Sequence, residues 1–233
     1  MRKPDQWWDV AWNPVTGCDR VSEGCDNCWA RAMNRRFKGG FDIVHHYSRY
    51  EQPFRLGSVP KRVFVVNMGD LFHPLITDHE ILRFFMFMIP PHQYFVLTKR
   101  PERMARFVKD VLSKAEGFNA DVMLGTSIEN QKAADQRLPW MEQIHGFRKF
   151  VSVEPMLGPV DLHLSEIELD WVVCGAETGP GARKMDHKWA VDLCNHCHFS
   201  GVPFFFKSAG NRTRIPHNLE VRQYPQKSFA LKK

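Results

Sequence analysis

Six short runs of β-branched and aromatic residues recur along the chain, and their spacing restricts the fold more than any other sequence feature. The runs are Arg62–Asn67, Tyr94–Thr98, Asp121–Thr126, Lys149–Val153, Asp170–Cys174 and Pro203–Phe206, and they start 21 to 33 residues apart. Such an interval fits one strand, one helix and two loops, and continuously apolar runs are typical of parallel strands covered on both faces. We therefore expect an α/β fold with a mainly parallel sheet.

The segments between the runs predict the helices that cover this sheet. Thr77 with Glu80 three residues later has the pattern of a capping box. A second helix is expected after Pro101, a favoured first-turn residue, and a third over residues 186–199, ending near Gly201. The apolar residues at helical spacing after Pro101 are Met104, Phe107, Val108, Val111 and Leu112.

Composition excludes several classes of protein. A hydrophobic content of 43%, with 18 Phe and 7 Trp, excludes disorder and low-complexity arrays. The longest apolar run, residues 84–89, is too short for a membrane span, and no signal peptide is evident, so we expect a cytoplasmic protein without a membrane partner. The net charge of +6 suits a polyanionic partner. No linker or repeat divides the chain, so we expect one domain over residues 1–233, with a polar, basic and loosely held tail from about residue 212.

Polar side chains follow almost every expected strand. The residues are Asn67, Gly69, Asp70, Thr98, Lys99, Arg100, Ser127, Glu129, Glu154, Gly175, Glu177 and Lys207. Active sites of parallel βα folds lie at the carboxyl ends of the strands, so this pattern predicts one shared polar rim. The alternative is that polar residues simply end strands.

Cys18, Cys25 and Cys28 form the cysteine group whose spacing favours chemistry. They lie in a glycine-bearing loop, GCDRVSEGCDNC, directly before the helix-like stretch WARAMNRRF. Three thiolates on one loop can hold a metal and leave a coordination position open. The alternatives are a structural zinc site completed by His45 or His46, and unrelated buried thiols.

Several motifs, taken in order, resemble a known family. They are WNPVTGC…GCDNCWA, NMGDLF, LTKRPERM, GTSIEN, VEPMLGPVDL, WVVCGAETGPGARKMDHKW and GVPFFFK, and they span about residues 7 to 210. These motifs look like the phage-borne three-cysteine family of the radical S-adenosylmethionine (SAM) superfamily, which is distantly similar to spore photoproduct lyase, a thymine-lesion repair enzyme. The resemblance implies a partial (β/α)6-type barrel with an extra C-terminal strand. It also implies a [4Fe–4S] cluster on Cys18, Cys25 and Cys28, with SAM on the fourth iron.

The cysteine spacing departs from the superfamily's commonest pattern. That pattern is Cys-x3-Cys-x2-Cys with an aromatic residue before the third cysteine, whereas here the first gap is six residues and Asn27 precedes Cys28. Wider gaps do occur in the superfamily. The longer loop bears on the geometry of the cluster and not on the identity of its ligands.

The resemblance further implies which strand-end residues contact SAM. The implied contacts are Met68, Gly69 and Asp70 for the methionine amino group, Lys99 for its carboxylate, Ser127 for a further polar contact and Glu154 for the ribose hydroxyls. Each has an alternative interpretation. Asp70 suits a turn or helix start, Lys99 with Arg100 a solvated charge pair, and Glu154 a strand-end salt bridge.

The expected function is that of a radical SAM enzyme that modifies or rearranges a nucleobase. The expected substrate is thymine or hypermodified thymine in phage DNA, or a nucleotide, and an external one-electron donor is required. If the gene is phage-encoded, the enzyme acts in the host cytoplasm. The alternative is a non-catalytic nucleic-acid-binding protein with a structural zinc or iron–sulfur site. It would bind phosphates through Arg31, Arg35, Arg36 and Lys38.

Other candidate features favour packing over chemistry. Cys194 and Cys197, beside His196 and His198, share the apolar face of the helix expected there, and Cys174 lies in a buried strand. Trp7, Trp8 and Trp12 are expected to pack near the cysteine loop, with base stacking as the alternative for the first two. The glycine-rich loop over residues 175–186 is expected to cover SAM or substrate.

Overall fold

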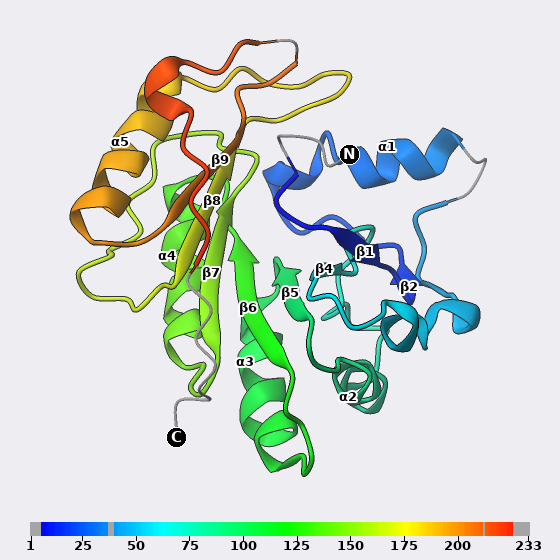
Figure 1. Cartoon of the computed structure of the whole chain (residues 1–233). Coiled ribbons are helices and arrows are strands. Elements are labelled where there is room, and N and C mark those ends of the chain that lie inside the picture. Colours follow the sequence, from blue (N-terminus) through cyan, green and yellow to red (C-terminus); the bar gives the residue numbers. More distant parts are fainter. Residues whose placement is uncertain (1–5, 37–39, 212, 226–233) are drawn as a thin grey trace.

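In the computed structural model, which describes residues 6–36, 40–211 and 213–225, seven parallel strands form one curled sheet (Figure 1). In spatial order they are β1 (Val10–Trp12), β4 (Arg62–Val65), β5 (Gln93–Thr98), β6 (Asp121–Ser127), β7 (Arg148–Val153), β8 (Trp171–Gly175) and β9 (Phe204–Ser208). Neighbouring strands pair in parallel throughout. The curl makes a half-barrel, so the expected α/β fold with a partial barrel of parallel strands is confirmed.

All six runs identified in the sequence are strands, and β9 is the C-terminal edge strand of the sheet. The strand that the sequence did not reveal is β1, which pairs Val10 with Val63 of β4 at the opposite edge. Three residues are too few for a recognisable pattern of alternation. A two-stranded antiparallel ribbon, β2 (Val15–Thr16) with β3 (Val44–His45), lies outside the main sheet.

The helices are α1 (Trp29–Arg36), α2 (Asp78–Met86), α3 (Pro101–Asp110), α4 (Gln131–Glu142) and α5 (His187–Phe199). The capping box of α2 forms as expected, since the Thr77 hydroxyl accepts from the Glu80 amide and the Glu80 carboxylate accepts from the Thr77 amide. Short 3-10 helices cover Glu23–Cys25, Tyr47–Arg49, Gln52–Arg55, Leu112–Lys114 and His217–Leu219. Within the described ranges, none of the helices combines the length and the apolarity that crossing a membrane requires.

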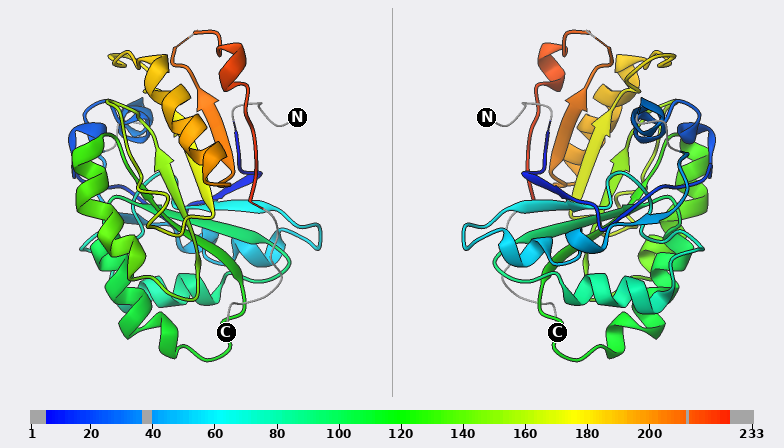
Figure 2. Two further views of the ribbon diagram at one scale, coloured as in Figure 1. Left: turned by 90° about the vertical axis from the view of Figure 1, so that its left-hand side faces the viewer. Right: turned by 90° about the vertical axis from the view of Figure 1, so that its right-hand side faces the viewer.

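Side chains of the strands alternate between an outer and an inner face. On the outer face, apolar residues of β4 to β6 pack against α2 and α3, and those of β7 to β9 pack against α4 and α5 (Figures 1 and 2). The inner face carries a mainly aromatic cluster of Trp7, Phe95, Met123, Phe150, Trp171, Val173 and Phe205. The ring of Trp7 lies 5.1 Å from Phe95 and 5.3 Å from Trp171. The N-terminal segment therefore fills the inside of the curl, and packing is confirmed for Trp7.

Three of the remaining cysteines belong to the core, as expected. Cys174 on β8 and Cys197 on α5 are fully buried in the outer cluster, and Cys194 packs against it. Burial raises the pKa of the Cys197 thiol to about 12 and raises that of Cys194. Trp12 is also buried on the outer side, where its indole N–H donates to the Arg49 carbonyl at 2.8 Å. These groups are structural.

The described part of the tail is held firmly against β9. Leu219 is fully buried, Phe205 and Arg222 form an antiparallel bridge, and the Gln223 amide donates to the Phe204 carbonyl at 2.9 Å. The Trp171 indole N–H donates to the Gln223 carbonyl at 2.9 Å. The expectation of a loosely held appendage is therefore wrong for residues 213–225, because their backbone completes the hydrogen bonding of the edge strand. Residues 226–233 lie outside the described part of the chain.

We expect Gly125→Ala to destabilise the fold by about 1–3 kcal/mol, because a Cβ there would lie 2.4 Å from the buried ring of Phe150. Gly158→Ala is the matched control, since its Cβ would meet only Asn130 at 3.8 Å. Urea unfolding of the two variants measures the difference. Equal free energies of unfolding for the two variants would show that the inner face can accommodate a methyl group at residue 125.

Candidate functional site

A pocket opens on the inner face of the half-barrel, where the strands end. The N-terminal segment, the cysteine loop (residues 17–28) and residues that follow β4 to β9 line it. The chemically active side chains and glycine among its lining are Cys18, Cys25, Cys28, Gly69, Asp70, Lys99, Ser127, Ser152, Glu154, Glu177 and Lys207. The polar residues that follow the strands thus meet at one edge, where parallel βα folds place their active sites.

The alternation of the strands explains why these side chains face inward. Lys99 lies four residues after Phe95, Ser127 four after Met123, and Glu154 four after Phe150. Successive residues of a strand point to opposite faces, so residues an even number apart share a face. On the inner face, the aromatic cluster therefore lies beneath the pocket, and the polar side chains follow it at the carboxyl ends of the strands.

The cysteine loop approaches the end of β4 closely at Gly69. The Gly17 amide donates to the Met68 carbonyl at 3.0 Å, and Gly17 and Gly69 form a parallel bridge. A Cβ on Gly69 would lie 2.7 Å from the Gly17 carbonyl oxygen. The close approach that Gly69 permits is thus one between two backbone segments. Met68 is not among the pocket-lining residues, and its amide donates to the Asn13 side chain at 3.0 Å.

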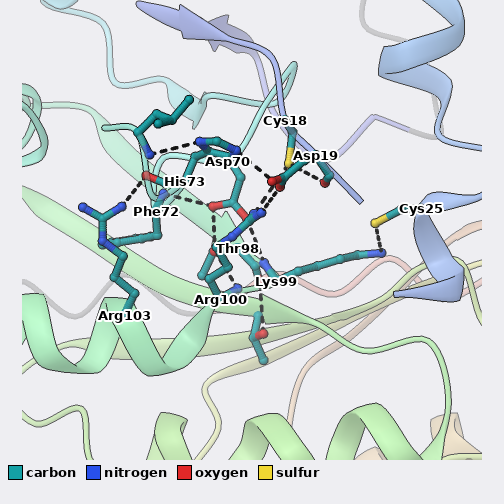
Figure 3. A network of polar contacts seen from close by, with 12 residues as sticks. Cys18, Asp19, Cys25, Asp70, Phe72, His73, Thr98, Lys99, Arg100 and Arg103 are labelled. Atoms are coloured by element: carbon teal, nitrogen blue, oxygen red, sulfur yellow. Dashed lines mark hydrogen bonds and ion pairs between the residues drawn. The ribbon is translucent and has the colours of Figure 1, made fainter. Parts of the chain in front are cut away.

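Asp70 is a buried carboxylate, 4% exposed, whose oxygens accept four hydrogen bonds (Figure 3). The donors are the Thr98 hydroxyl at 2.7 Å, the Arg100 guanidinium at 2.8 Å, and the amides of Phe72 at 3.0 Å and Lys99 at 3.3 Å. The bond to Phe72 is the turn contact considered for this residue. The other three join the ends of β4 and β5, so Asp70 fixes the wall of the pocket.

Lys99 and Arg100 are not a solvated charge pair, because each side chain is only 15% exposed. The Lys99 ammonium lies 3.7 Å from the Cys25 sulfur and 3.8 Å from a carboxylate oxygen of the buried Glu129. The Arg100 guanidinium bonds Asp70 and Asp19 and lies 3.6 Å from the Cys18 sulfur. Figure 3 shows both cations reaching from the end of β5 toward the cysteine loop.

These surroundings affect the two thiols in opposite directions. Burial, aided by the negative charge of Asp70, raises the pKa of Cys18 to about 11 against the opposing effect of Arg100. Burial also acts to raise the pKa of Cys25, but the Lys99 ammonium and nearby hydrogen bonds outweigh it and lower the pKa. Cys25 is therefore the readier of the two to act as a thiolate.

The donor set of the pocket fits an iron–sulfur cluster held by three cysteines. Cys18, Cys25 and Cys28 are free thiols in this structure. Over the described residues, no three His, Cys, Asp or Glu side chains stand close enough together to hold a metal ion, so the fit is one of ligand chemistry. A zinc site completed by histidine is disfavoured, because His45 bonds the Tyr50 hydroxyl and His46 the Thr16 hydroxyl, both at 2.8 Å, and neither lines the pocket. Three thiols without an imidazole match cluster ligation.

The loop after β8 holds the other side of the cysteine loop. Asn27 donates to the Glu177 carboxylate at 3.0 Å and to the Gly181 carbonyl at 2.9 Å. Arg183 donates to Glu177 through its backbone amide at 2.8 Å and its guanidinium Nε at 2.9 Å, and also to the Glu23 carbonyl at 3.0 Å. We call Asn27, Glu177 and Arg183 the clamp. The glycine-rich loop thus covers the cysteine loop and adds Glu177 to the pocket lining.

Glu154 and Ser127 both line the pocket, but they differ in whether the protein supplies a partner for their side chains. Glu154 accepts from the Lys207 ammonium at 2.5 Å, so the strand-end salt bridge considered for it is present, although both partners also line the pocket. Ser127 is 7% exposed, and its hydroxyl makes no hydrogen bond to any residue that the structure describes, whereas its carbonyl accepts from Arg137 at 2.6 Å. One group is neutralised by the protein and the other is available to a ligand.

The basic residues considered as a phosphate-binding face do not act together. Arg31 turns toward the cysteine loop, where it donates to the Cys18 carbonyl at 3.2 Å, and its guanidinium lies over the Phe41 ring. Arg35 is exposed. The side chain of Arg36 and all of Lys38 lie outside the described part of the chain. The contact of Arg31 therefore holds the cysteine loop in place.

The sequence placed Arg100 in the expected polar rim but gave no sign that it holds the cysteine loop, and it did not indicate Arg183 and Asn27 as site residues. Their partners are up to 160 residues away in the sequence, and no local pattern signals such pairing. The one available signal was the placement of Arg100 directly after β5. The glycine-rich sequence of residues 175–186 predicted a loop over the pocket, but it did not indicate that this loop contacts the cysteine loop.

One family model matches nearly the whole chain. It is described as "Protein of unknown function (DUF5131)" and matches residues 4–227, which include the pocket, the cysteine loop and the clamp. No curated protein and no solved structure matches the chain. The family's description assigns no activity, so the activity has to be argued from the pocket.

We expect Glu177→Gln to lower stability at pH 7 by about 2 kcal/mol, allowing for the partial exposure of Arg183. Burial works to raise the pKa of Glu177, but hydrogen bonds from Arg183 and Asn27 outweigh it and lower the pKa from 4.5 to about 2. A depressed folded-state pKa stabilises the protein above pH 4.5, and this contribution is lost as the pH falls toward 2. The variant should therefore lose less stability than the wild type across that window.

Denaturant unfolding at a series of pH values measures this effect. Glu102→Gln is the control, because Glu102 is half exposed and its salt bridge is with the exposed Arg106 one helical turn away. It should behave as the wild type does. A Glu177→Gln protein with the wild-type stability and pH dependence would show that the clamp contributes nothing to folding.

Proposed function

The chain belongs to the DUF5131 family, and we propose that it is a radical SAM enzyme that acts on a nucleobase. The observation that carries the proposal is the composition of one pocket. Three free thiols of a single loop line it together with the strand-end residues that the resemblance implies for SAM. Such a ligand set matches a [4Fe–4S] cluster with one iron left open to a small molecule.

A [4Fe–4S] cluster with SAM supplies a 5′-deoxyadenosyl radical, which takes hydrogen from carbon atoms that no side-chain base can deprotonate. Cys18, Cys25 and Cys28 would hold the cluster. Lys99, 3.7 Å from the Cys25 sulfur, helps to lower the pKa of that thiol, and Arg100, 3.6 Å from the Cys18 sulfur, partly offsets the burial that raises the pKa of Cys18. The protein's own part is to hold the cysteine ligands, to position SAM and the substrate, and to shield the radical from solvent.

The remaining implied contacts distribute along the strand ends. The Lys99 ammonium offers a charge-assisted bond to the methionine carboxylate. Within Met68–Asp70, the Met68 carbonyl already accepts from Gly17 and the Asp70 carboxylate is occupied by four donors, so Gly69 is the member best placed to receive the amino group. The Ser127 hydroxyl has no partner among the residues that the structure describes, and Glu154 uses one oxygen for Lys207 and keeps the other for the ribose.

The apolar floor supports chemistry that must exclude water. Trp7, Trp8, Phe64 and Leu97 line the pocket beneath its polar rim. A closed apolar surface protects a reactive species from solvent and holds the substrate in one orientation. An external one-electron donor would reach the cluster from outside. We place the activity in the cytoplasm, of the host if the gene is phage-borne, where thiols stay reduced.

The nucleobase as substrate is supported by the resemblance and by the net charge of +6. We propose thymine or a hypermodified thymine in DNA, which would have to be flipped out of a duplex to reach the pocket. The non-catalytic alternative has less support, because Arg31 is engaged with the cysteine loop. Mass spectrometry of nucleosides from cells with and without the active gene identifies the product.

We expect Cys18→Ala, Cys25→Ala or Cys28→Ala each to abolish retention of the cluster and formation of 5′-deoxyadenosine, because two thiolates cannot replace three. Anaerobic reconstitution with iron and sulfide, followed by iron analysis and SAM cleavage, measures both. Cys194→Ala is the control, since that thiol packs against the core on α5. Wild-type protein that stays colourless and binds one zinc ion tightly would overturn the proposal.

We expect Lys99→Met to weaken SAM binding by about tenfold or more while the cluster is retained, because a charge-assisted bond is lost and no thiolate is removed. Equilibrium binding of SAM to the reconstituted variant measures the change. Lys188→Met is the control, because Lys188 is exposed on α5 and its salt bridge is with Asp192, one helical turn away. Wild-type affinity in Lys99→Met would remove Lys99 from the cofactor site.

A further inference from the structure

Two buried serines lie side by side in the pocket without partners for their hydroxyls. Ser127 of β6 and Ser152 of β7 are register partners, and they are 7% and 2% exposed. Both line the pocket, and neither hydroxyl bonds to any residue in the described ranges. Neither hydroxyl is among the buried side-chain atoms without a partner, so both are accessible from the pocket and can bond a ligand there.

The adjacent ion pair between Glu154 and Lys207 forms over Gly175 of the intervening strand β8, which has no side chain to separate them. Lys207 on β9 reaches Glu154 after β7 across Gly175 of β8, with 2.5 Å between the charged atoms. A Cβ on Gly175 would contact the side chains of both, at 3.4 and 3.5 Å. An ammonium has three donors, and Glu154 takes one of them, so Lys207 keeps donors for a ligand.

Trp8 adds an aromatic surface to the same end of the pocket. The Lys207 ammonium lies 5.6 Å from the centroid of the Trp8 ring, and both residues line the pocket. The ring is held edge-on by Trp7 at 5.0 Å and Phe64 at 5.2 Å. A rigid indole beside a cation offers a planar ligand a stacking partner and a hydrogen-bond donor together.

This end of the pocket is separate from the sulfurs of Cys18 and Cys25. Those two lie against Arg100 and Lys99, which follow β5, whereas Lys207 belongs to β9. Strands β6, β7 and β8 lie between β5 and β9 in the sheet. The pocket therefore spans five strands, and a cofactor that extends from the cysteines to Glu154 leaves the β9 end, with Trp8 and Lys207, for a second molecule.

We infer that Trp8, Ser152 and Lys207 form a substrate subsite for a planar heterocycle that bears a ring oxo group. Trp8 stacks on the ring, and the Lys207 ammonium and the Ser152 hydroxyl donate to the oxo oxygen. Thymine has such an oxygen and adenine has none, so the subsite discriminates between bases. The inference rests on the proposed function for the reaction that follows binding, and on the pocket alone for the binding itself.

The test is equilibrium binding of thymidine and deoxyadenosine to the reconstituted full-length protein. Thymidine should bind at least tenfold more tightly than deoxyadenosine. Lys207→Met should lose about tenfold or more of the thymidine affinity, and Ser152→Ala several-fold, with SAM binding unchanged in Ser152→Ala. Lys188→Met, on the exposed face of α5, should bind as the wild type does.

Ser152→Ala keeps the proposal falsifiable if Lys207→Met fails to fold, because it removes one oxygen and disturbs no ion pair. Wild-type thymidine affinity in either folded variant, or equal binding of deoxyadenosine, would overturn the subsite. Binding of short oligothymidylate and oligoadenylate is measured in the same way. The same preference for thymine within the oligonucleotides, lost in the same variants, supports a base presented by DNA.

The same preparations separate this inference from the proposed function. Iron content and SAM cleavage report on the cluster, and thymidine binding reports on the subsite. Thymidine binding that depends on Lys207 in a protein unable to hold a cluster contradicts the proposed function and supports the subsite. A cluster that cleaves SAM in a protein without discrimination between bases contradicts the subsite alone.

Discussion

The partly buried guanidinium of Arg100 joins the cysteine loop to the sheet, and the geometry of the site depends on this contact. It bonds Asp70 from the end of β4 at 2.8 Å, it bonds Asp19 in the loop, and it lies 3.6 Å from the sulfur of Cys18. The cysteine loop contains only one short 3-10 turn, so it cannot order three thiols by itself against the entropy of a flexible chain. A cation with several fixed donors can order it, and removal of a partner from such a buried pair is strongly destabilising.

The clamp completes the attachment at the opposite side of the loop. Asn27 stands where the commonest pattern of the superfamily that the sequence resembles has an aromatic residue, and its side-chain amide donates to both Glu177 and Gly181. No aromatic side chain can donate two hydrogen bonds in this way. Departure from the common motif is therefore matched by a second attachment point, since the loop with the longer cysteine gap is tied both to the β4–β5 side and to the β8 side of the half-barrel.

Much of the fold was predictable from the sequence, because its strands are continuous apolar runs and α2 has a local capping signal. β1 was missed because it has three residues, and α4 because its sequence contains Pro139, a residue that usually ends a helix, and lacks a clear apolar stripe. In the site, alternation from Phe95 and Phe150 gives the inward direction of Lys99 and Glu154. The pairing of Glu154 with Lys207, and of Asn27 with Glu177, joins residues 53 and 150 positions apart, and no local pattern encodes such contacts.

The hydrogen-bonding state of each polar group separates the wall of the pocket from the surface that a ligand meets. Asp70, Glu129 and Glu177 are buried, and each accepts several hydrogen bonds from the protein. Such carboxylates stabilise the fold and have little capacity left for a ligand. Ser127 and Ser152 are buried residues too, but their hydroxyls line the pocket and have no partner among the described residues. The unpaired hydroxyls on β6 and β7, beside the ion pair of Glu154 and Lys207, therefore form the part of the pocket surface that has hydrogen-bonding capacity left for a ligand.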